Sequence, residues 1–314
     1  MIVTLTLNPA IDRTVEIEAL KLNGVNHVNR TKRDAAGKGI NVGKVLDRLG
    51  FSATLTGFLA GQNGQFIRNN LCDLKLNHHF IDVPGETREN LKVWQTSTQS
   101  MIELNEQGPS FDQEAYDRLE RYLIDVLKPG DWLVLSGSLP KGSPKTIYQQ
   151  LIKRVKVNGV MTVLDASNEA LFLGLEAHPT VIKPNREELE TLAGKALPTL
   201  SDIATFLNDP RFEKIEEIYV TLGAQGALAK KDTQTLIVEP LTLITKSTVG
   251  AGDSFVAGLM VAKAKGQSFE ACLRFASATA SAATLTEGTQ APSAYDVQTM
   301  LERMTIKPYQ EEGV

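Results

Sequence analysis

Short strand-like runs alternate with longer helical segments over most of the chain. Residues 2–7 alternate apolar side chains with threonine, a pattern typical of a strand. Residues 132–135 are apolar at every position, as strands buried on both faces of a parallel sheet are. Four further runs have strand character: 54–58, 161–164, 180–183 and 218–221. Because segments of helical periodicity separate these runs, the sequence predicts an α/β fold with a mostly parallel sheet flanked by helices.

Two stretches interrupt this α/β order. Residues 15–18 and 25–31 alternate on either side of Asn23-Gly24, which predicts a β-hairpin with a tight turn. Residues 86–104 return to strand-like alternation and predict a second antiparallel pair. We expect the two pairs to join in a small separate sheet. The expected organisation is therefore a core of residues 1–12, 34–86 and 105–314, with small-sheet segments 13–33 and 87–104 inserted in it.

Composition narrows the classes of function. The chain has 314 residues, of which 42% are hydrophobic and 22% charged, the values of an ordinary globular protein. Its net charge of −4 argues against a nucleic-acid-binding protein, although a small basic pocket would still fit. The two cysteines lie far apart, and neither a signal peptide nor an apolar run of membrane-spanning length is present. We therefore expect a cytoplasmic protein with no nucleic-acid or membrane partner.

A glycine turn before a helix is the first candidate site. Gly250, Ala251 and Gly252 precede Asp253, and the apolar residues after Asp253 recur with helical spacing. Glycine lets backbone amides converge, and a helix N-terminus adds unpaired donors and partial positive charge. Such a turn can hold an anion. A lone aspartate there is more often a helix cap, but beside a transferring phosphate it could accept a proton from an attacking hydroxyl.

A second glycine turn carries a lysine. Gly37-Lys38-Gly39 precedes the helical pattern of residues 42–49, which ends near Gly50. Neither a P-loop nor a dinucleotide-binding fingerprint fits these residues. A lysine in a turn is more often simply a surface residue, so this motif alone is weak.

Polar or glycine-rich turns follow several of the predicted strands. In a parallel sheet such turns gather at one edge, where ligands bind. Lys38 and Arg88 would supply positive charge for a substrate phosphate, although a lone arginine such as Arg88 is more often solvated. Glu188 could hold Mg²⁺ through water. Positioning, charge neutralisation and one base are what phosphoryl transfer requires. The turns are at Asp12, 37–39, Ser138, 185–188, 223–226 and 250–253.

The chain resembles the ribokinase/phosphofructokinase-B family of sugar kinases. The resemblance rests on four stretches and on their spacing over nearly the whole chain. The last stretch is a specific signature, and the glycine-lysine-glycine stretch is moderately specific. The four are residues 6–12, 35–42, 183–190 and 247–254.

The resemblance implies a ribokinase-like core with a β-lid formed by the two inserted segments, and a homodimer formed through that lid. It makes Asp253 the catalytic base and the amides of Gly250, Ala251 and Gly252 the anion hole. It assigns ATP to Asn185, Thr221, Gly223, Gly226, Ser247, Thr248, Gly250 and Gly252. It assigns the sugar phosphate to Asp12, Gly37, Lys38, Asn41, Arg88, Ser138 and Asp253, and Mg²⁺ to Glu188.

The activity implied by the resemblance is ATP-dependent phosphorylation of a sugar phosphate. The expected substrate is D-fructose 1-phosphate, phosphorylated at its 6-hydroxyl. Tagatose 6-phosphate and fructose 6-phosphate are the close alternatives. A non-catalytic sensor of sugar phosphates or nucleotides on the same fold is the distant one, and Asp253 speaks against it because binding alone requires no base.

Overall fold

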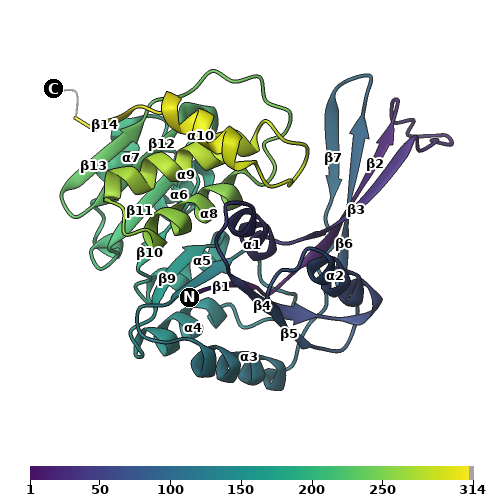
Figure 1. Ribbon diagram of the computed structural model, residues 1–314, viewed down its shortest axis with the longest axis horizontal. Helices are drawn as coiled ribbons and strands as arrows, with labels where there is room; N and C mark the ends of the chain where they lie inside the picture. The colour runs from purple at the N-terminus through teal and green to yellow at the C-terminus, as the bar shows by residue number, and fades with distance from the viewer. Residues whose placement is uncertain (311–314) are drawn as a thin grey trace.

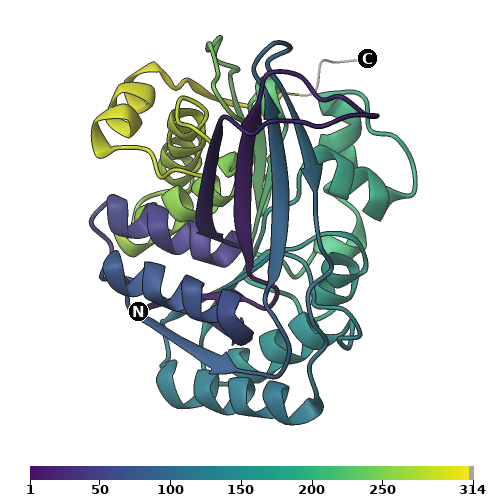
Figure 2. The same ribbon diagram turned by 90° about the vertical axis from the view of Figure 1, so that its right-hand side faces the viewer.

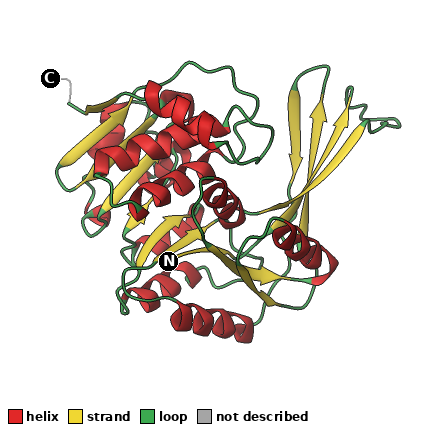
Figure 3. Ribbon diagram, in the orientation of Figure 1, coloured by secondary structure: helices red, strands yellow, loops and turns green. Residues whose placement is uncertain are grey.

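The computed structural model describes residues 1–310, which form a large sheet flanked by helices and a smaller sheet beside it (Figures 1 and 3). Within these residues the large sheet has ten strands in the order β14-β13-β12-β11-β10-β9-β8-β1-β4-β5. Its strands are β1 (Ile2–Thr6), β4 (Thr54–Leu59), β5 (His78–Asp82), β8 (Trp132–Ser136), β9 (Met161–Asp165), β10 (Val181–Ile182), β11 (Glu217–Thr221), β12 (Ala227–Lys231), β13 (Gln234–Val238) and β14 (Ile306–Pro308).

Seven neighbouring strands of the large sheet, from β11 to β5, run parallel. The three strands β12, β13 and β14 extend one edge in antiparallel fashion. Strand order reverses beside β1, because β4 and β5 lie on one side of it and β8 to β11 on the other. Ligands of open α/β sheets bind at the carboxyl ends of strands next to such a reversal.

Helices cover both faces of the large sheet, as the sequence predicts. One apolar core contains side chains of α3–α6, α7 and the strands, and the other contains those of α1, α8, α9, α10 and the opposite strand faces. The helices are α1 (Lys38–Arg48), α2 (Gly61–Asp73), α3 (Gln113–Val126), α4 (Ile147–Lys156), α5 (Asn168–Leu175), α6 (Arg186–Ala193), α7 (Leu200–Phe206), α8 (Ala251–Ala264), α9 (Phe269–Ala283) and α10 (Ala294–Arg303). No helix in the described part of the chain is both long and apolar enough to cross a membrane.

The smaller sheet has the strand order β3-β2-β6-β7 and extends to one side of the large sheet (Figures 1 and 2). It consists of β2 (Ala10–Ile17), β3 (Arg30–Ala36), β6 (Arg88–Gln95) and β7 (Ser100–Leu104). Each hairpin is antiparallel, and the two hairpins meet through the parallel pair β2–β6. The small separate sheet is therefore confirmed.

A turn is present at residues 22–24 and the predicted antiparallel pair forms, but the turn does not join the two strands directly as a tight hairpin would. Residues 18–29 form a long connection between β2 and β3, and the second strand begins only at Arg30. The side chain of Asn26 bonds the backbone of Lys21 and Gly24 inside that connection, so it has its own local turn rather than a two-residue hairpin. The apolar alternation of residues 25–31 belongs to exposed side chains such as Val25, which no sheet neighbour covers.

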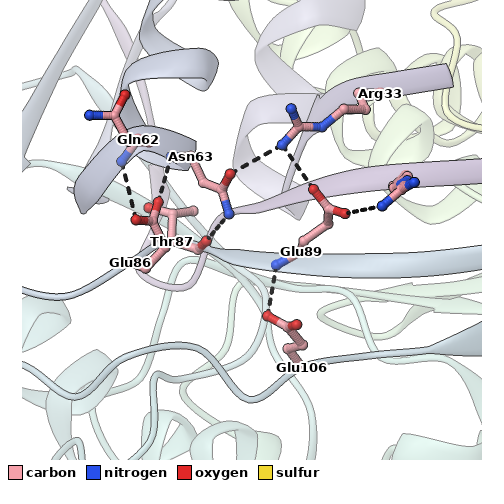
Figure 4. Close-up of polar contacts among 8 residues, drawn as sticks. Arg33, Gln62, Asn63, Glu86, Thr87, Glu89 and Glu106 are labelled. Atoms are coloured by element: carbon pink, nitrogen blue, oxygen red, sulfur yellow. Dashed lines mark hydrogen bonds and ion pairs between the residues drawn. The ribbon is translucent and has the colours of Figure 1, made fainter.

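A polar network joins the smaller sheet to α2 at its base (Figure 4). Arg33 of β3 donates to Asn63 of α2 and to Glu89 of β6, at 3.1 and 2.8 Å. The carboxylate of Glu86 accepts hydrogen bonds from the backbone amides of Gln62 and Asn63 in the first turn of α2. Negative charge at a helix N-terminus is favourable, so these contacts fix the base of the sheet against the core.

Candidate functional site

The glycine turn lies at the start of α8 and has the geometry of an anion hole. Gly250 caps the helix with φ of 81°, a conformation that favours glycine. The amide of Ala251 bonds the carbonyl of Thr248, and that of Ser254 bonds the carbonyl of Gly250. Among residues 1–310, the amides of Gly252 and Asp253 have no acceptor. Two free donors therefore remain at the positive end of the helix dipole.

Asp253 lies in the first turn of α8 and does not cap it. Its side chain is buried, and Asn41 of α1 donates a hydrogen bond to Oδ2 over 2.7 Å. Burial and, to a smaller extent, the negative charge of Asp165 raise the pKa of Asp253 to about 6, against the lowering effect of Lys38, Asn41 and Lys183. A carboxylate with this pKa is mostly ionised at neutral pH and basic enough to accept a proton, which suits a general base.

Asp165 was not predicted from the sequence, yet it is the most buried charge of the site. It is the last residue of β9 and is fully enclosed. Its Oδ1 lies 3.0 Å from Nζ of Lys183 and 3.4 Å from Nζ of Lys38. Burial alone would raise the pKa of Asp165, but the two lysines hold it below its usual value. Asp165 in turn raises the pKa of Lys38.

Arg88 and Asp12 lie together at the base of the smaller sheet. The guanidinium of Arg88 donates to the carbonyls of Glu106 and Asn8, at 2.9 and 3.1 Å. Asp12 accepts hydrogen bonds from Asn90 at 3.0 Å and from Lys92 at 2.6 Å. Burial lowers the pKa of Arg88, although Asp12 and Glu106 oppose this shift.

The carboxyl ends of β1 and β8 bring one more predicted residue into this group. Ser138 follows β8, and its hydroxyl accepts a hydrogen bond from Asn8, which follows β1, over 3.3 Å. Sequence reasoning missed Asn8, Asn90 and Lys92 as polar partners. For Asn90 and Lys92 the signal was the spacing from Arg88, since alternate residues of a strand share a face.

Lys38 and Arg88 have different acidic neighbours. The charges acting on Lys38 are Asp165, Asp253 and Glu188, whereas those acting on Arg88 are Asp12 and Glu106. Lys38 is the first residue of α1, after Gly37, whose φ of 128° and closeness to Thr6 require glycine. The two predicted phosphate-binding cations also contact different groups: Lys38 contacts Asp165, whereas Arg88 contacts the carbonyls of Glu106 and Asn8.

The predicted nucleotide-binding residues form a third group. Asn185 and Glu188 make a reciprocal capping box at the start of α6, at 2.8 and 2.9 Å. Asn185 also forms a parallel bridge with Thr221, the last residue of β11. The turn that follows contains Gly223 and Gly226, both at positive φ. A Cβ at Gly226 would lie 2.3 Å from the carbonyl oxygen of Val238 at the end of β13, so only glycine fits there.

Ser247 and Thr248 lead into the glycine turn. The hydroxyl of Ser247 accepts a hydrogen bond from the amide of Val249 over 3.2 Å, so the approach to α8 is itself a tight turn. Their assignment to the nucleotide stays a prediction, as do the other residue roles given above.

Several buried polar atoms around the site have no partner within residues 1–310. They are Oδ1 of Asn8, Oδ1 of Asn41, Oδ2 of Asp165, Oγ of Ser136 and Nε of Arg88. Buried polar groups are normally hydrogen-bonded, and leaving one unpaired costs about 1–3 kcal/mol. Four of these five atoms are acceptors or hydroxyls, which is what a ligand rich in hydroxyl groups would satisfy.

Glu188 is the carboxylate that the sequence predicts to hold a metal ion. The described residues contain no group of three or more acidic, histidine or cysteine side chains arranged to hold a metal. Glu188 uses Oε2 in the capping box, which leaves its other oxygen for a further contact. This donor set fits Mg²⁺ held mainly by phosphate and water, because magnesium retains much of its hydration in proteins.

Comparison with known proteins fixes the family. The profile of the pfkB family of carbohydrate kinases matches residues 5–295. The chain belongs to this family. Kinases of the family use ATP, and the sequence-based prediction of family and of the ribokinase-like fold is thereby confirmed.

Solved structures agree with the family. Phosphofructokinase-2 from Escherichia coli, in complex with potassium, is 30% identical over 96% of this chain and 98% of its own, with a TM-score of 0.92. The tetrameric inhibited form of that enzyme has a TM-score of 0.90 at 30% identity, over 96% of this chain and 98% of that one. A Thermotoga maritima protein, named as a possible 1-phosphofructokinase, is 26% identical over 98% of this chain and 99% of its own, with a TM-score of 0.86.

Proposed function

We propose that this sugar kinase phosphorylates D-fructose 1-phosphate at its 6-hydroxyl, giving fructose 1,6-bisphosphate and ADP. The new bond joins the 6-oxygen to the terminal phosphorus of ATP, and the bond from that phosphorus to the bridging oxygen breaks. The hydroxyl proton passes to the carboxylate of Asp253, and the electron pair of the broken bond leaves with ADP. No water takes part in this balance.

The position of Asp253 carries the proposal. A buried carboxylate stands beside two free backbone amides, and Asn41 holds one of its oxygens. The amides suit the phosphoryl group, whereas Oδ1 of Asp253 remains for the attacking hydroxyl. Orientation of the reactants and stabilisation of developing charge are the main contributions that a protein makes to phosphoryl transfer.

Mg²⁺ would be held at Glu188 through water and by the phosphates of ATP. When bound, it neutralises negative charge on those phosphates. The residues of this chain do the rest: the turn at Gly223–Gln225 and Gly226 receives the nucleotide, and Asn185 fixes that turn beside α6 through its bridge to Thr221.

The phosphate already on the sugar would lie at the base of the smaller sheet. Arg88 is held there by two carbonyls, and its buried Nε has no partner in the described part of the chain. Asp12, fixed by Asn90 and Lys92, would accept hydrogen bonds from the sugar hydroxyls. The 1-phosphate is chosen over tagatose 6-phosphate or fructose 6-phosphate on the four sequence stretches that carry the resemblance.

A coupled assay of ADP release tests the substrate. The purified protein is given ATP, Mg²⁺ and one of three sugars: fructose 1-phosphate, fructose 6-phosphate or tagatose 6-phosphate. We expect the highest kcat/KM with fructose 1-phosphate. A higher value with either 6-phosphate would replace the substrate but keep the reaction. Binding of sugar phosphate without ADP release would support the non-catalytic sensor instead.

We also propose that the chain forms a homodimer through the smaller sheet. Val15, Ile17 and Val93 form a small apolar cluster on one face of that sheet, with Leu91 and Ile102 against it. A sheet this small is marginal unless it packs on something. Light scattering at micromolar concentration should give the mass of two chains, and Ile102→Asp should shift it to one. A monomeric parent protein would contradict the dimer.

A further inference from the structure

A single buried carboxylate connects three separate elements of the site. Asp165 ends β9, Lys38 begins α1, and Lys183 follows β10. Both ammonium groups contact the same oxygen, Oδ1, whereas Oδ2 is buried and has no partner among residues 1–310. The side chain of Lys183 is only 4% exposed and that of Lys38 is 36% exposed. One acid thus fixes two flexible cations.

The two ammonium groups lie next to the glycine turn and the base. A Cβ placed on Gly252 would lie 3.7 Å from Nζ of Lys183, its nearest non-neighbouring atom. That ammonium therefore stands beside the amides that have no acceptor. Lys38 acts electrostatically on Asp253 and also feels Glu188. The acids that act most on Arg88, by contrast, are Asp12 and Glu106.

We infer that Asp165 is a positioning residue, which holds the ammonium groups of Lys38 and Lys183 against the phosphoryl group in transfer. This inference rests on the proposed kinase reaction. It assigns Lys38 to the phosphoryl group that is transferred from ATP, rather than to the phosphate already on the sugar. It assigns Lys183 to the same phosphoryl group. The sugar's own phosphate is then left to Arg88.

The charges explain why one acid should serve two lysines. Asp165 neutralises one of the two positive charges, so the cluster keeps a net charge of +1 toward an incoming anion. Fixing the lysines in advance also removes the loss of side-chain freedom that would otherwise accompany binding. The unpartnered Oδ2 of Asp165 marks the side of the carboxylate that neither lysine covers.

A double-mutant cycle tests the inference. Asp165→Asn keeps the shape of the side chain but removes the charge that fixes the lysines. Lys38→Met removes the more exposed of the two ammonium groups. We expect Asp165→Asn to lower kcat about ten-fold or more in the parent protein. In the Lys38→Met background the same substitution should lower kcat by a factor several times smaller, because the effects of residues that act through one another are not additive. Equal factors in both backgrounds would overturn the inference.

A binding measurement provides a readout that does not depend on turnover. Thermal melting is recorded with ADP and with a non-hydrolysable ATP analogue. Lys183→Met and Asp165→Asn should reduce the extra stabilisation that the analogue gives over ADP, because only the analogue carries the terminal phosphate. Unchanged stabilisation by the analogue in both variants would contradict the placement of the lysines, and a variant with no cooperative melt is replaced by Lys38→Met.

Glu217→Gln is the matched control. Glu217 is also buried between two lysines, Lys231 and Lys263, but it begins β11 and therefore lies at the opposite edge of the sheet. Its variant should keep kcat and the preference for the ATP analogue. Together, these experiments distinguish a failure of the proposed kinase reaction from a failure of the proposed role of Asp165. A parent protein that phosphorylates none of the three sugar phosphates rejects the proposed reaction, whereas an active parent with additive variants rejects only the role of Asp165.

Discussion

Two buried acids lie at opposite ends of parallel strands in the same sheet, since Asp165 ends β9 and Glu217 begins β11. Each of them contacts two lysines. Glu217 has both oxygens occupied: Oε1 contacts Lys231 at 3.0 Å, and Oε2 contacts Lys263 at 2.5 Å and the hydroxyl of Tyr219 at 2.6 Å. At Asp165 both lysines contact Oδ1, and the buried Oδ2 has no partner within the described residues.

The difference separates a structural cluster from a functional one. At Glu217 the hydrogen-bonding capacity of the carboxylate is used within the protein, and the cluster connects β11, β12 and α8. Within residues 1–310, Oδ2 of Asp165 accepts no hydrogen bond, and Oδ1 of nearby Asn41 accepts none either. Because an unpaired buried polar group costs free energy, its survival at the carboxyl edge of the sheet is best explained by a ligand that pairs with it. The following experiments probe this contrast.

Asp253→Asn should have the largest effect, at the carboxyl edge. Asparagine keeps the shape and a hydrogen bond with Asn41 but cannot accept the proton. We expect kcat to fall by about 10² or more, with both KM values moving much less, since general-base assistance is worth roughly 10²–10⁴ in rate. Steady-state kinetics on protein with an unchanged melting temperature measures this. Turnover within a few-fold of the parent would remove Asp253 as the base.

Arg88→Ala should have the next largest effect and should appear in KM rather than in kcat. A charge-assisted hydrogen bond is worth about 1.5–3 kcal/mol, which corresponds to roughly ten- to a hundred-fold in affinity. We expect KM for the sugar phosphate to rise by this factor, while KM for ATP stays nearly constant. Arg33→Ala, in the same sheet but engaged with Glu89 and Asn63, is the control. Equal KM values for the sugar phosphate in the parent and in Arg88→Ala would show that Arg88 does not bind the substrate phosphate.

The dependence of kcat/KM on pH tests whether Asp165 acts on Asp253. The pKa of Asp253 is raised to about 6, so below that pH the base is protonated and kcat/KM should fall about ten-fold per unit. Because Asp165 contributes to the raised pKa, Asp165→Asn should move the acidic limb to lower pH. The ionisation of the substrate phosphate would not move. A limb that stays in place in the variant would therefore assign it to the substrate.

Glu217→Gln should have the smallest effect on activity and a clear one on stability. Breaking a buried ion pair by removing one partner costs up to about 3–5 kcal/mol, and less here because the side chain of Lys231 is 42% exposed. We expect a lower melting temperature with kcat unchanged. A loss of turnover comparable to that of Asp165→Asn would show that the two clusters do not differ as proposed, since α8 would then transmit the change to Asp253.

Much of the fold could be predicted from local pattern. The strand at 132–135 is apolar throughout and lies in the middle of the parallel sheet as β8. The turn at residues 22–24 and the antiparallel pair are both present, but the strands begin farther from the turn than predicted, because a two-residue turn signal says nothing about how far the flanking strands pair. Pairing is decided by the cross-strand partners, and β3 finds them only from Arg30 onward.

The site was predictable where a motif had a local shape. Gly250–Gly252 with Asp253 form one turn of a helix, so four neighbouring residues suffice to recognise the anion hole. Asp165 was not predicted, because in the sequence it looks like any polar residue at the end of an apolar strand. Its partners are 127 residues upstream for Lys38, and Lys183 belongs to a different strand end. Nothing local distinguishes an acid that will meet two lysines.

By itself the sequence determined the α/β order, the inserted small sheet, the glycine turns and the family. These depend on periodicity, on glycine at positive φ and on spacing along the chain, all of which are local quantities. Only the tertiary structure decided which charges meet. It set Lys38 beside Asp165 and Arg88 beside the carbonyls of Asn8 and Glu106. It paired both oxygens of Glu217, whereas Oδ2 of Asp165 has no partner among residues 1–310. Electrostatic pairing and burial depend on distances between elements, and those exist only once the chain has folded.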